Sequence, residues 1–147
     1  MKAGLITLGC DVLKIVIPML IGALLDGDRG ICVAGIAGII GHCFPVFFKF
    51  RGGKGVSVAA TIAAFLGWEV LAISLGLFIV MVLLTRIVSL SSMLAAVCLF
   101  TTTLIFYGDN TYKIILAAVT MVLIIFMHRE NIKRIIKGEE KKFSPKR

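Results

Sequence analysis

Hydrophobic positions form long runs along almost the whole chain, and short polar breaks separate one run from the next. Several runs approach the roughly 20 apolar residues that a helix needs to cross a bilayer. From His128 onward the chain is polar and basic, which predicts a short surface helix followed by a basic end. The pattern predicts six spanning or near-spanning helices, at about residues 4–25, 30–48, 55–68, 69–85, 88–107 and 111–127.

The third run is the shortest, so we expect its helix to be tilted, partly re-entrant or shielded by its neighbours. Composition supports a membrane protein, because 59% of the residues are hydrophobic and the mean hydropathy is +1.05. Ordinary globular chains are about 45–50% apolar. We therefore predict an all-α, polytopic membrane helix bundle, in which residues 1–147 form one integral-membrane domain and about 128–147 form a cytoplasmic basic tail.

The positions of the cations predict the orientation in the membrane, since Lys and Arg concentrate on the cytoplasmic side. If the N-terminus and every second break are cytoplasmic, thirteen of the sixteen Lys and Arg residues lie inside. Arg29 and Lys113 then lie outside, and Lys14 lies within a segment. We therefore predict a multi-pass membrane protein with both termini in the cytoplasm.

Other features of the composition argue against several classes of function. The net charge of +8 sits beside membrane segments and lacks an aromatic-rich soluble surface, so no nucleic-acid partner is expected. The four cysteines are isolated in or beside apolar runs, which indicates small buried hydrophobic residues. Two histidines without further clustered ligands indicate no metal site. No cofactor is predicted.

The most polar and glycine-rich break lies between residues 41 and 57. It contains His42 and Arg51, and Lys54 stands between two glycines just before a predicted helix. Glycines allow a ligand to approach the backbone closely, and N–H groups at a helix start bind anions. This pattern indicates a phosphate site, although a flexible interfacial turn with snorkelling cations remains an alternative. The motif is not a Walker loop, because Gly55 stands where that loop has a hydroxyl residue.

A second candidate group begins where the last apolar run ends. His128 and Asn131 are three residues apart and would share one face of a helix. A neutral imidazole at this place can donate a hydrogen bond to a phosphate or accept one from a hydroxyl, or it can simply anchor the helix at the interface. Asp11 and Lys14 are also three apart, inside the first run, where they form either a packing ion pair or part of a polar cavity. Ser89 could line a polar opening on the cytoplasmic side of the membrane together with these groups.

The motifs in these breaks resemble a known family. Gly41-His42-x-x-Pro45, continued by Phe48-Lys49-Phe50-Arg51-Gly52-Gly53-Lys54-Gly55-Val56, is similar to a signature of the bacterial acyl-phosphate-dependent glycerol-3-phosphate acyltransferases, the PlsY family. His128-Arg129-Glu130-Asn131-Ile132-x-Arg134 with Gly138-Glu139 resembles a second signature. Asp11-x-x-Lys14 and Arg86-x-Val88-Ser89-Leu90 also look like that family. The resemblance covers nearly all of the chain.

The resemblance implies an enzyme of phospholipid synthesis that transfers an acyl group from acyl phosphate to the 1-hydroxyl of glycerol 3-phosphate, giving lysophosphatidic acid. Its partners would be these two substrates and membrane lipid, and its location would be the bacterial inner membrane. It implies catalytic or substrate-orienting roles for Lys54, His128 and Asn131. Phosphate or substrate binding would involve Gly52, Gly53, Lys54, Gly55, Ser89, His42 and Arg51, and supporting roles would fall to Asp11, Lys14 and Glu139.

The chain aligns just after the first signature of that family, a Ser/Gly/Asn/Thr-rich loop that follows an additional membrane helix. This start is expected either for an unusual complete member or for a piece of a longer protein. Two other hypotheses remain open. One is a weak or inactive paralogue that binds an anionic substrate, and the other is a small membrane transporter, indicated by the intramembrane Asp11 and Lys14.

Overall fold

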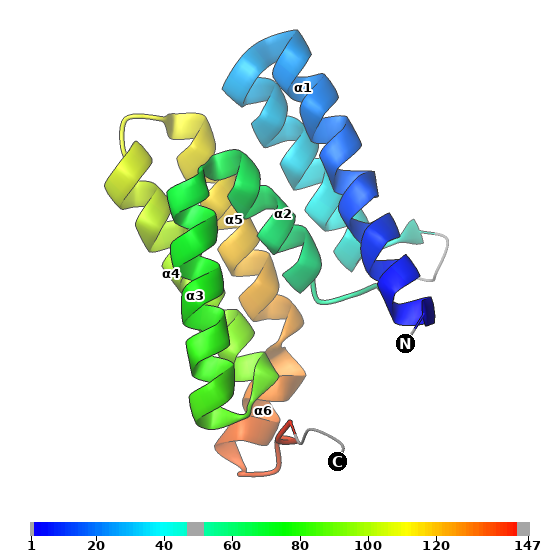
Figure 1. Cartoon of the computed structure of the whole chain (residues 1–147), viewed down its shortest axis with the longest axis vertical. Helices are drawn as coiled ribbons and strands as arrows, with labels where there is room; N and C mark the ends of the chain where they lie inside the picture. Colours follow the sequence, from blue (N-terminus) through cyan, green and yellow to red (C-terminus); the bar gives the residue numbers. More distant parts are fainter. Residues whose placement is uncertain (1, 47–51, 144–147) are drawn as a thin grey trace.

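The computed structural model describes residues 2–46 and 52–143, and all regular secondary structure in these ranges is helical. Helices therefore follow one another without a strand in the described part of the chain, which confirms the predicted all-α class. The helices, labelled in Figure 1, are α1 (Lys2–Cys43), α2 (Val56–Leu66), α3 (Trp68–Thr85), α4 (Val88–Tyr107), α5 (Thr111–Met127) and α6 (Arg129–Ile136).

Helix α1 is a hairpin whose two arms lie side by side (Figure 1). The chain reverses at Asp26 and Gly27, which have non-helical backbone angles. Gly27 has φ 52°, a value that glycine adopts without the strain that a side chain would bring. The two arms correspond to the predicted runs 4–25 and 30–48. The second arm ends earlier than predicted, at Cys43, because Pro45 disfavours helical backbone in the residue before it.

The remaining predicted runs correspond closely to α2, α3, α4 and α5. Helix α2 has 11 residues and is about 16 Å long at 1.5 Å per residue, roughly half of a bilayer core. Helices α3 and α4 are each long and apolar enough to cross a membrane. Helices α5 and α6 form a further candidate if the pair, bent by 55°, is taken as one broken span.

Packing divides the apolar side chains between a core and an outer surface. Ile62 and Leu66 of the short α2 are fully buried, as expected for a helix that its neighbours shield. By contrast, Leu24, Leu83 and Leu84 are 88%, 73% and 74% exposed. Large apolar side chains at such exposure are unfavourable in water and favourable against lipid. The arrangement is that of an integral membrane bundle.

The segments that carry the candidate site lie at the same end of the bundle. The start of α2, the α3–α4 turn, the α5–α6 junction and both ends of the described chain are found there (Figure 1). Segments that are distant in the sequence therefore meet at one end of the bundle, where they line a common cavity. At the opposite end, Tyr107 donates a hydrogen bond to Glu69 Oε2 (2.8 Å), and Asn110 donates one to Asp28 Oδ2 (2.6 Å).

Candidate active site

A polar cavity of about 320 Å³ lies where these segments meet. Its wall comes from the loop before α2, the first residues of α4, the α5–α6 junction and the chain that follows α6. The lining residues are Lys54, Val56, Val88, Ser89, Ser92, His128, Asn131, Glu140 and Lys141. The structure therefore brings together four of the predicted site residues: Lys54, Ser89, His128 and Asn131.

A chain of hydrogen bonds crosses this cavity. Lys54 Nζ donates to Asn131 Oδ1 at 2.7 Å, although the two residues are 77 positions apart. The amide nitrogen of Asn131 donates in turn to Glu140 Oε1 at 2.5 Å. These bonds fix the Asn131 amide, because its oxygen must face the ammonium group and its nitrogen must face the carboxylate.

Glu140 is the residue on which the wall of the cavity converges. Oε1 also accepts from Ser89 Oγ at 2.6 Å, and Oε2 accepts from Arg134 Nε at 2.7 Å. The Glu140 side chain is only 9% exposed. Hydrogen bonds from Ser89 and Asn131, together with the Arg134 guanidinium, lower the pKa of Glu140 to about 2. The carboxylate is therefore ionised throughout the physiological range and joins α4, α6 and the tail.

His128 occupies the junction between α5 and α6 and is 1% exposed. Its Nδ1 lies 2.8 Å from the carbonyl oxygen of Ile124, one turn earlier. Since a carbonyl oxygen only accepts, Nδ1 carries the proton, and Nε2 of the neutral ring is left as an acceptor. The ring can therefore accept a hydrogen bond from a hydroxyl group.

The glycine-rich loop reaches the cavity through Lys54 and packs against the end of α1. The N–H of Gly53 donates to His42 O at 3.3 Å, and a Cβ at Gly53 would collide with the His42 ring. A side chain at position 53 would therefore force the His42 ring to move. Gly55 precedes the first residue of α2, and Gly52 packs against backbone oxygens at the end of α1. The predicted site residue Arg51 lies outside the described residues.

His42, Asp11 and Lys14 form a separate cluster between the two arms of α1. Lys14 Nζ pairs with Asp11 Oδ1 at 2.6 Å, and His42 Nδ1 lies 3.6 Å from the same oxygen. None of the three lines the polar cavity. The cluster contacts the glycine-rich loop through His42, whose backbone oxygen accepts from the N–H of Gly53. The described residues contain no group of three or more His, Cys, Asp and Glu side chains that could hold a metal.

The structure places Glu140, rather than Glu139, in the cavity. Glu139 is exposed, and its backbone N–H donates to Arg134 O at 2.8 Å. Sequence reasoning missed Glu140 and Lys141, because both follow the end of α6, where helical spacing no longer indicates direction. The one available signal was Gly138, a residue type that commonly ends a helix and turns the chain back.

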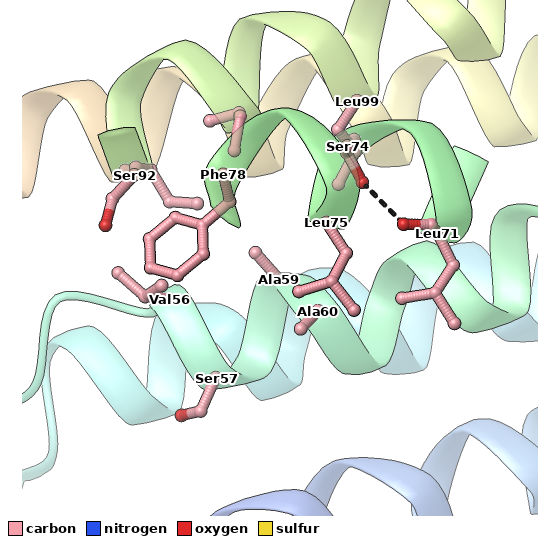
Figure 2. Close-up of a pocket in the computed structure, with 13 residues that line it drawn as sticks. Val56, Ser57, Ala59, Ala60, Leu71, Ser74, Leu75, Phe78, Ser92 and Leu99 are labelled. Atoms are coloured by element: carbon pink, nitrogen blue, oxygen red, sulfur yellow. Dashed lines mark hydrogen bonds between the residues drawn. The ribbon is translucent and has the colours of Figure 1, made fainter. Parts of the chain in front are cut away.

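An apolar pocket of about 420 Å³ (Figure 2) adjoins the polar cavity, because Val56 and Ser92 line both. It lies between α2, α3 and α4, with Ile124 of α5 at its wall. Sequence reasoning did not predict this pocket, because it arises from small residues on helices that are distant in the chain. The site is thus a polar compartment joined to an apolar one.

Comparison with known proteins identifies the family of this chain. Residues 1–138 match the family model described as glycerol-3-phosphate acyltransferase. A glycerol-3-phosphate acyltransferase of Desulfotalea psychrophila is 39% identical over 99% of this chain and 76% of its own length. Glycerol-3-phosphate acyltransferase 2 of Bacillus anthracis is 40% identical over 96% of this chain and 73% of its own.

Two solved structures share the fold. Both are crystal structures of PlsY (YgiH), an integral membrane glycerol 3-phosphate acyltransferase, one in the glycerol 3-phosphate form and one in the lysophosphatidic acid form. Each has a TM-score of 0.89 and 35% identity over 97% of this chain, which covers 72% and 74% of the respective structures. The chain belongs to the glycerol-3-phosphate acyltransferase family.

Proposed function

We propose that this protein transfers an acyl group from acyl phosphate to the 1-hydroxyl of glycerol 3-phosphate, giving lysophosphatidic acid for phospholipid synthesis. Family membership supports an acyltransferase that acts on glycerol 3-phosphate. The related PlsY structures are a glycerol 3-phosphate form and a lysophosphatidic acid form, and these two molecules are the acceptor and the product of the proposed reaction.

The observation that carries the choice of donor is the junction between the two compartments. The polar cavity offers Lys54, Lys141 and the start of α2 to a phosphate, whereas the adjoining pocket is walled almost entirely by carbon. A molecule with a phosphate head and a hydrocarbon tail matches both. Its carbonyl carbon would lie between them, near Val56 and Ser92.

The reaction needs alignment and neutralisation of charge more than a protein nucleophile. The hydroxyl oxygen of glycerol 3-phosphate attacks the carbonyl carbon, and the bond from that carbon to the phosphate oxygen breaks. The departing phosphate takes up the hydroxyl proton, so the products are an ester and inorganic phosphate. Lys54 and the loop N–H groups stabilise the phosphate charge, while His128 Nε2 and Asn131 Oδ1 orient glycerol 3-phosphate by accepting hydrogen bonds from its two hydroxyls.

The other predicted residues act on the loop and on the wall. His42, held near Asp11 and Lys14, sets the position of Gly53 and therefore of Lys54. Gly52 and Gly55 allow the loop its close approach and its turn into α2. Ser89 binds Glu140, and Glu140 takes the supporting role that the sequence assigned to Glu139.

The test is product formation in lipid nanodiscs with acyl phosphate and glycerol 3-phosphate. We expect Lys54→Ala and His128→Ala each to lower kcat/KM about 100-fold or more, since single preorganised donors contribute roughly 10²–10³. Lys137→Ala, an exposed cation of the tail, is the matched control and should retain activity. Binding of glycerol 3-phosphate without any product would instead indicate the binding paralogue.

We also place the protein in the bacterial inner membrane with both termini in the cytoplasm. The distribution of cations supports this orientation, and the two ends of the described chain lie on one side of the bundle, the side that carries the site (Figure 1). Trypsin should cut the basic tail after Lys141 or Lys142 in inverted membrane vesicles and leave it intact in right-side-out vesicles. Cleavage of the tail in right-side-out vesicles would reverse the orientation.

A further inference from the structure

The apolar pocket has two distinct ends. At one end Val56 and Phe78 stand beside Ser92, and Val56 and Ser92 also line the polar cavity (Figure 2). At the other end lie Leu71, Ser74 and Leu99, with Leu75, Ala59 and Ala60 between the two ends (Figure 2). The pocket therefore leads away from the polar compartment along the helices.

The helices themselves give the depth of this pocket. On α4 it runs from Ser92 to Leu99, and on α3 it runs from Phe78 back to Leu71. Seven residues at 1.5 Å each make a path of about 10 Å along either helix. Depth along the path can therefore be read from residue numbers: Ala95 lies about 4.5 Å along α4 from Ser92, and Ser74 lies about 6 Å along α3 from Phe78.

The lining explains why an apolar chain, rather than water, fits inside. Four alanines from α2 and α4 contribute to the wall and leave the space open. The Ser74 hydroxyl already donates to Val70 O at 2.6 Å and also lies within 3.3 Å of Leu71 O, so it offers little to a water molecule. A buried water usually makes about three hydrogen bonds, and this wall does not supply them.

The pocket is also open on one side. Ala60 and Leu75 are exposed, and in a membrane they would face lipid. A hydrocarbon chain can therefore enter from the bilayer without passing through water, while its head group stays at the polar end.

We propose that this pocket selects the acyl donor by chain length, with Ala95 and Ser74 determining how far the chain can extend. The proposal rests on the acyl-phosphate function above and assigns specificity within it. A side chain enlarged at Ala95 would stop the chain about 4.5 Å along the path, and one enlarged at Ser74 would stop it slightly further along, at about 6 Å. Chains that stop short of the added side chain would be unaffected.

The experiment compares wild type, Ala95→Leu and Ser74→Leu in nanodiscs with a series of acyl phosphates of increasing length. Each variant should retain wild-type kcat/KM for short donors and lose at least about tenfold for long ones, since one misplaced methylene is worth roughly 10–200-fold in an apolar pocket. The loss should begin at shorter chains in Ala95→Leu than in Ser74→Leu. Ala64→Leu, an exposed change on α2 outside the pocket, should leave the length profile unchanged.

An equal loss for all donors, or an unchanged profile in both pocket variants, would overturn the proposal. A binding measurement separates this result from failure of the proposed function. Non-reactive alkyl phosphates of the same lengths should raise the thermal unfolding midpoint of the wild type, and the long ones should lose this effect in Ser74→Leu. If no acyl phosphate yields product but this length dependence of binding appears, the pocket assignment stands and the acyl-transfer function fails. If the binding effect is independent of length, the pocket assignment fails.

Discussion

Replacement of Glu140 by Gln tests whether one carboxylate holds the polar site together. The carboxylate accepts from Ser89 and Asn131 on one oxygen and from Arg134 on the other. A glutamine has nearly the same shape but replaces one acceptor oxygen with an NH₂ donor. It can face the Ser89 and Asn131 donors or the Arg134 donor with its oxygen, but it cannot satisfy both sides.

The expected magnitude follows from the bond that is lost. A hydrogen bond to a charged group contributes roughly 1.5–3 kcal/mol, which corresponds to about 10- to 150-fold if the loss is felt fully in the transition state. The amide of Asn131 would also lose the partner that keeps its oxygen on Lys54. We therefore expect Glu140→Gln to lower kcat/KM for lysophosphatidic acid formation by roughly 10- to 100-fold, and Glu139→Gln to change it less than about twofold.

The pH dependence of stability provides a second reading of the same residue. The pKa of Glu140 is about 2 in the folded protein, against 4.5 ordinarily. The ionised form therefore stabilises the fold fully above pH 4.5, and this contribution is lost as the pH falls from 4.5 toward 2. The thermal midpoint of the wild type should fall more steeply over that range than the midpoint of Glu140→Gln. Wild-type activity of Glu140→Gln, or an equal defect in Glu139→Gln, would refute the assigned role.

Three further changes test the loop, a strained turn and the opposite end of the bundle. Gly53→Ala should displace His42 and reduce activity by at least about tenfold. Gly41→Ala should leave activity unchanged, because a Cβ at position 41 meets no other atom. Equal activity in the two variants would contradict the close approach of Gly53 to His42. Arg86 has φ 58°, so Arg86→Gly should raise the free energy of unfolding by about 0.5–1 kcal/mol in chemical denaturation, and a lower value would argue against strain. Tyr107→Phe removes the hydrogen bond to Glu69 and should lower the free energy of unfolding by about 1 kcal/mol. It should change kcat little, because Tyr107 lies at the end of the bundle opposite the site. A large loss of kcat would show coupling between the two ends.

The helices were predictable because each break carries a strong local signal. The predicted runs 88–107 and 111–127 have the same limits as α4 and α5, since Tyr107-Gly108-Asp109-Asn110 interrupts the apolar sequence with turn-forming residues. The reversal at Asp26 and Gly27 was also located correctly. Local signals could not show that only these two residues interrupt the helix. The length of the interruption depends on how the two arms of α1 pack.

The site was predictable only where the chemistry is visible in the sequence. Lys54 and His128 stand out as polar groups at the ends of apolar runs, and their common end of the bundle follows from the alternation of spans. Glu140 does not stand out, since its role comes from a tail that turns back onto α4 and α6. The apolar pocket is less visible still, because alanines that leave a space are indistinguishable in sequence from alanines that fill one.

The bend at His128 explains how a membrane helix and a surface helix build one polar site. The 55° angle between α5 and α6 turns the chain back toward the start of α2, where Asn131 meets Lys54. The tail then returns to the α3–α4 turn, where the N–H of Phe143 donates to Arg86 O at 2.6 Å. Lys54 therefore donates to a neutral partner, the amide oxygen of Asn131. A phosphate is a stronger partner for an ammonium group than an amide is, so its arrival would free the Asn131 oxygen to accept from the substrate hydroxyl. Glu140 would keep the amide in place during this exchange, which makes binding of the phosphate and orientation of the nucleophile consequences of the same contact.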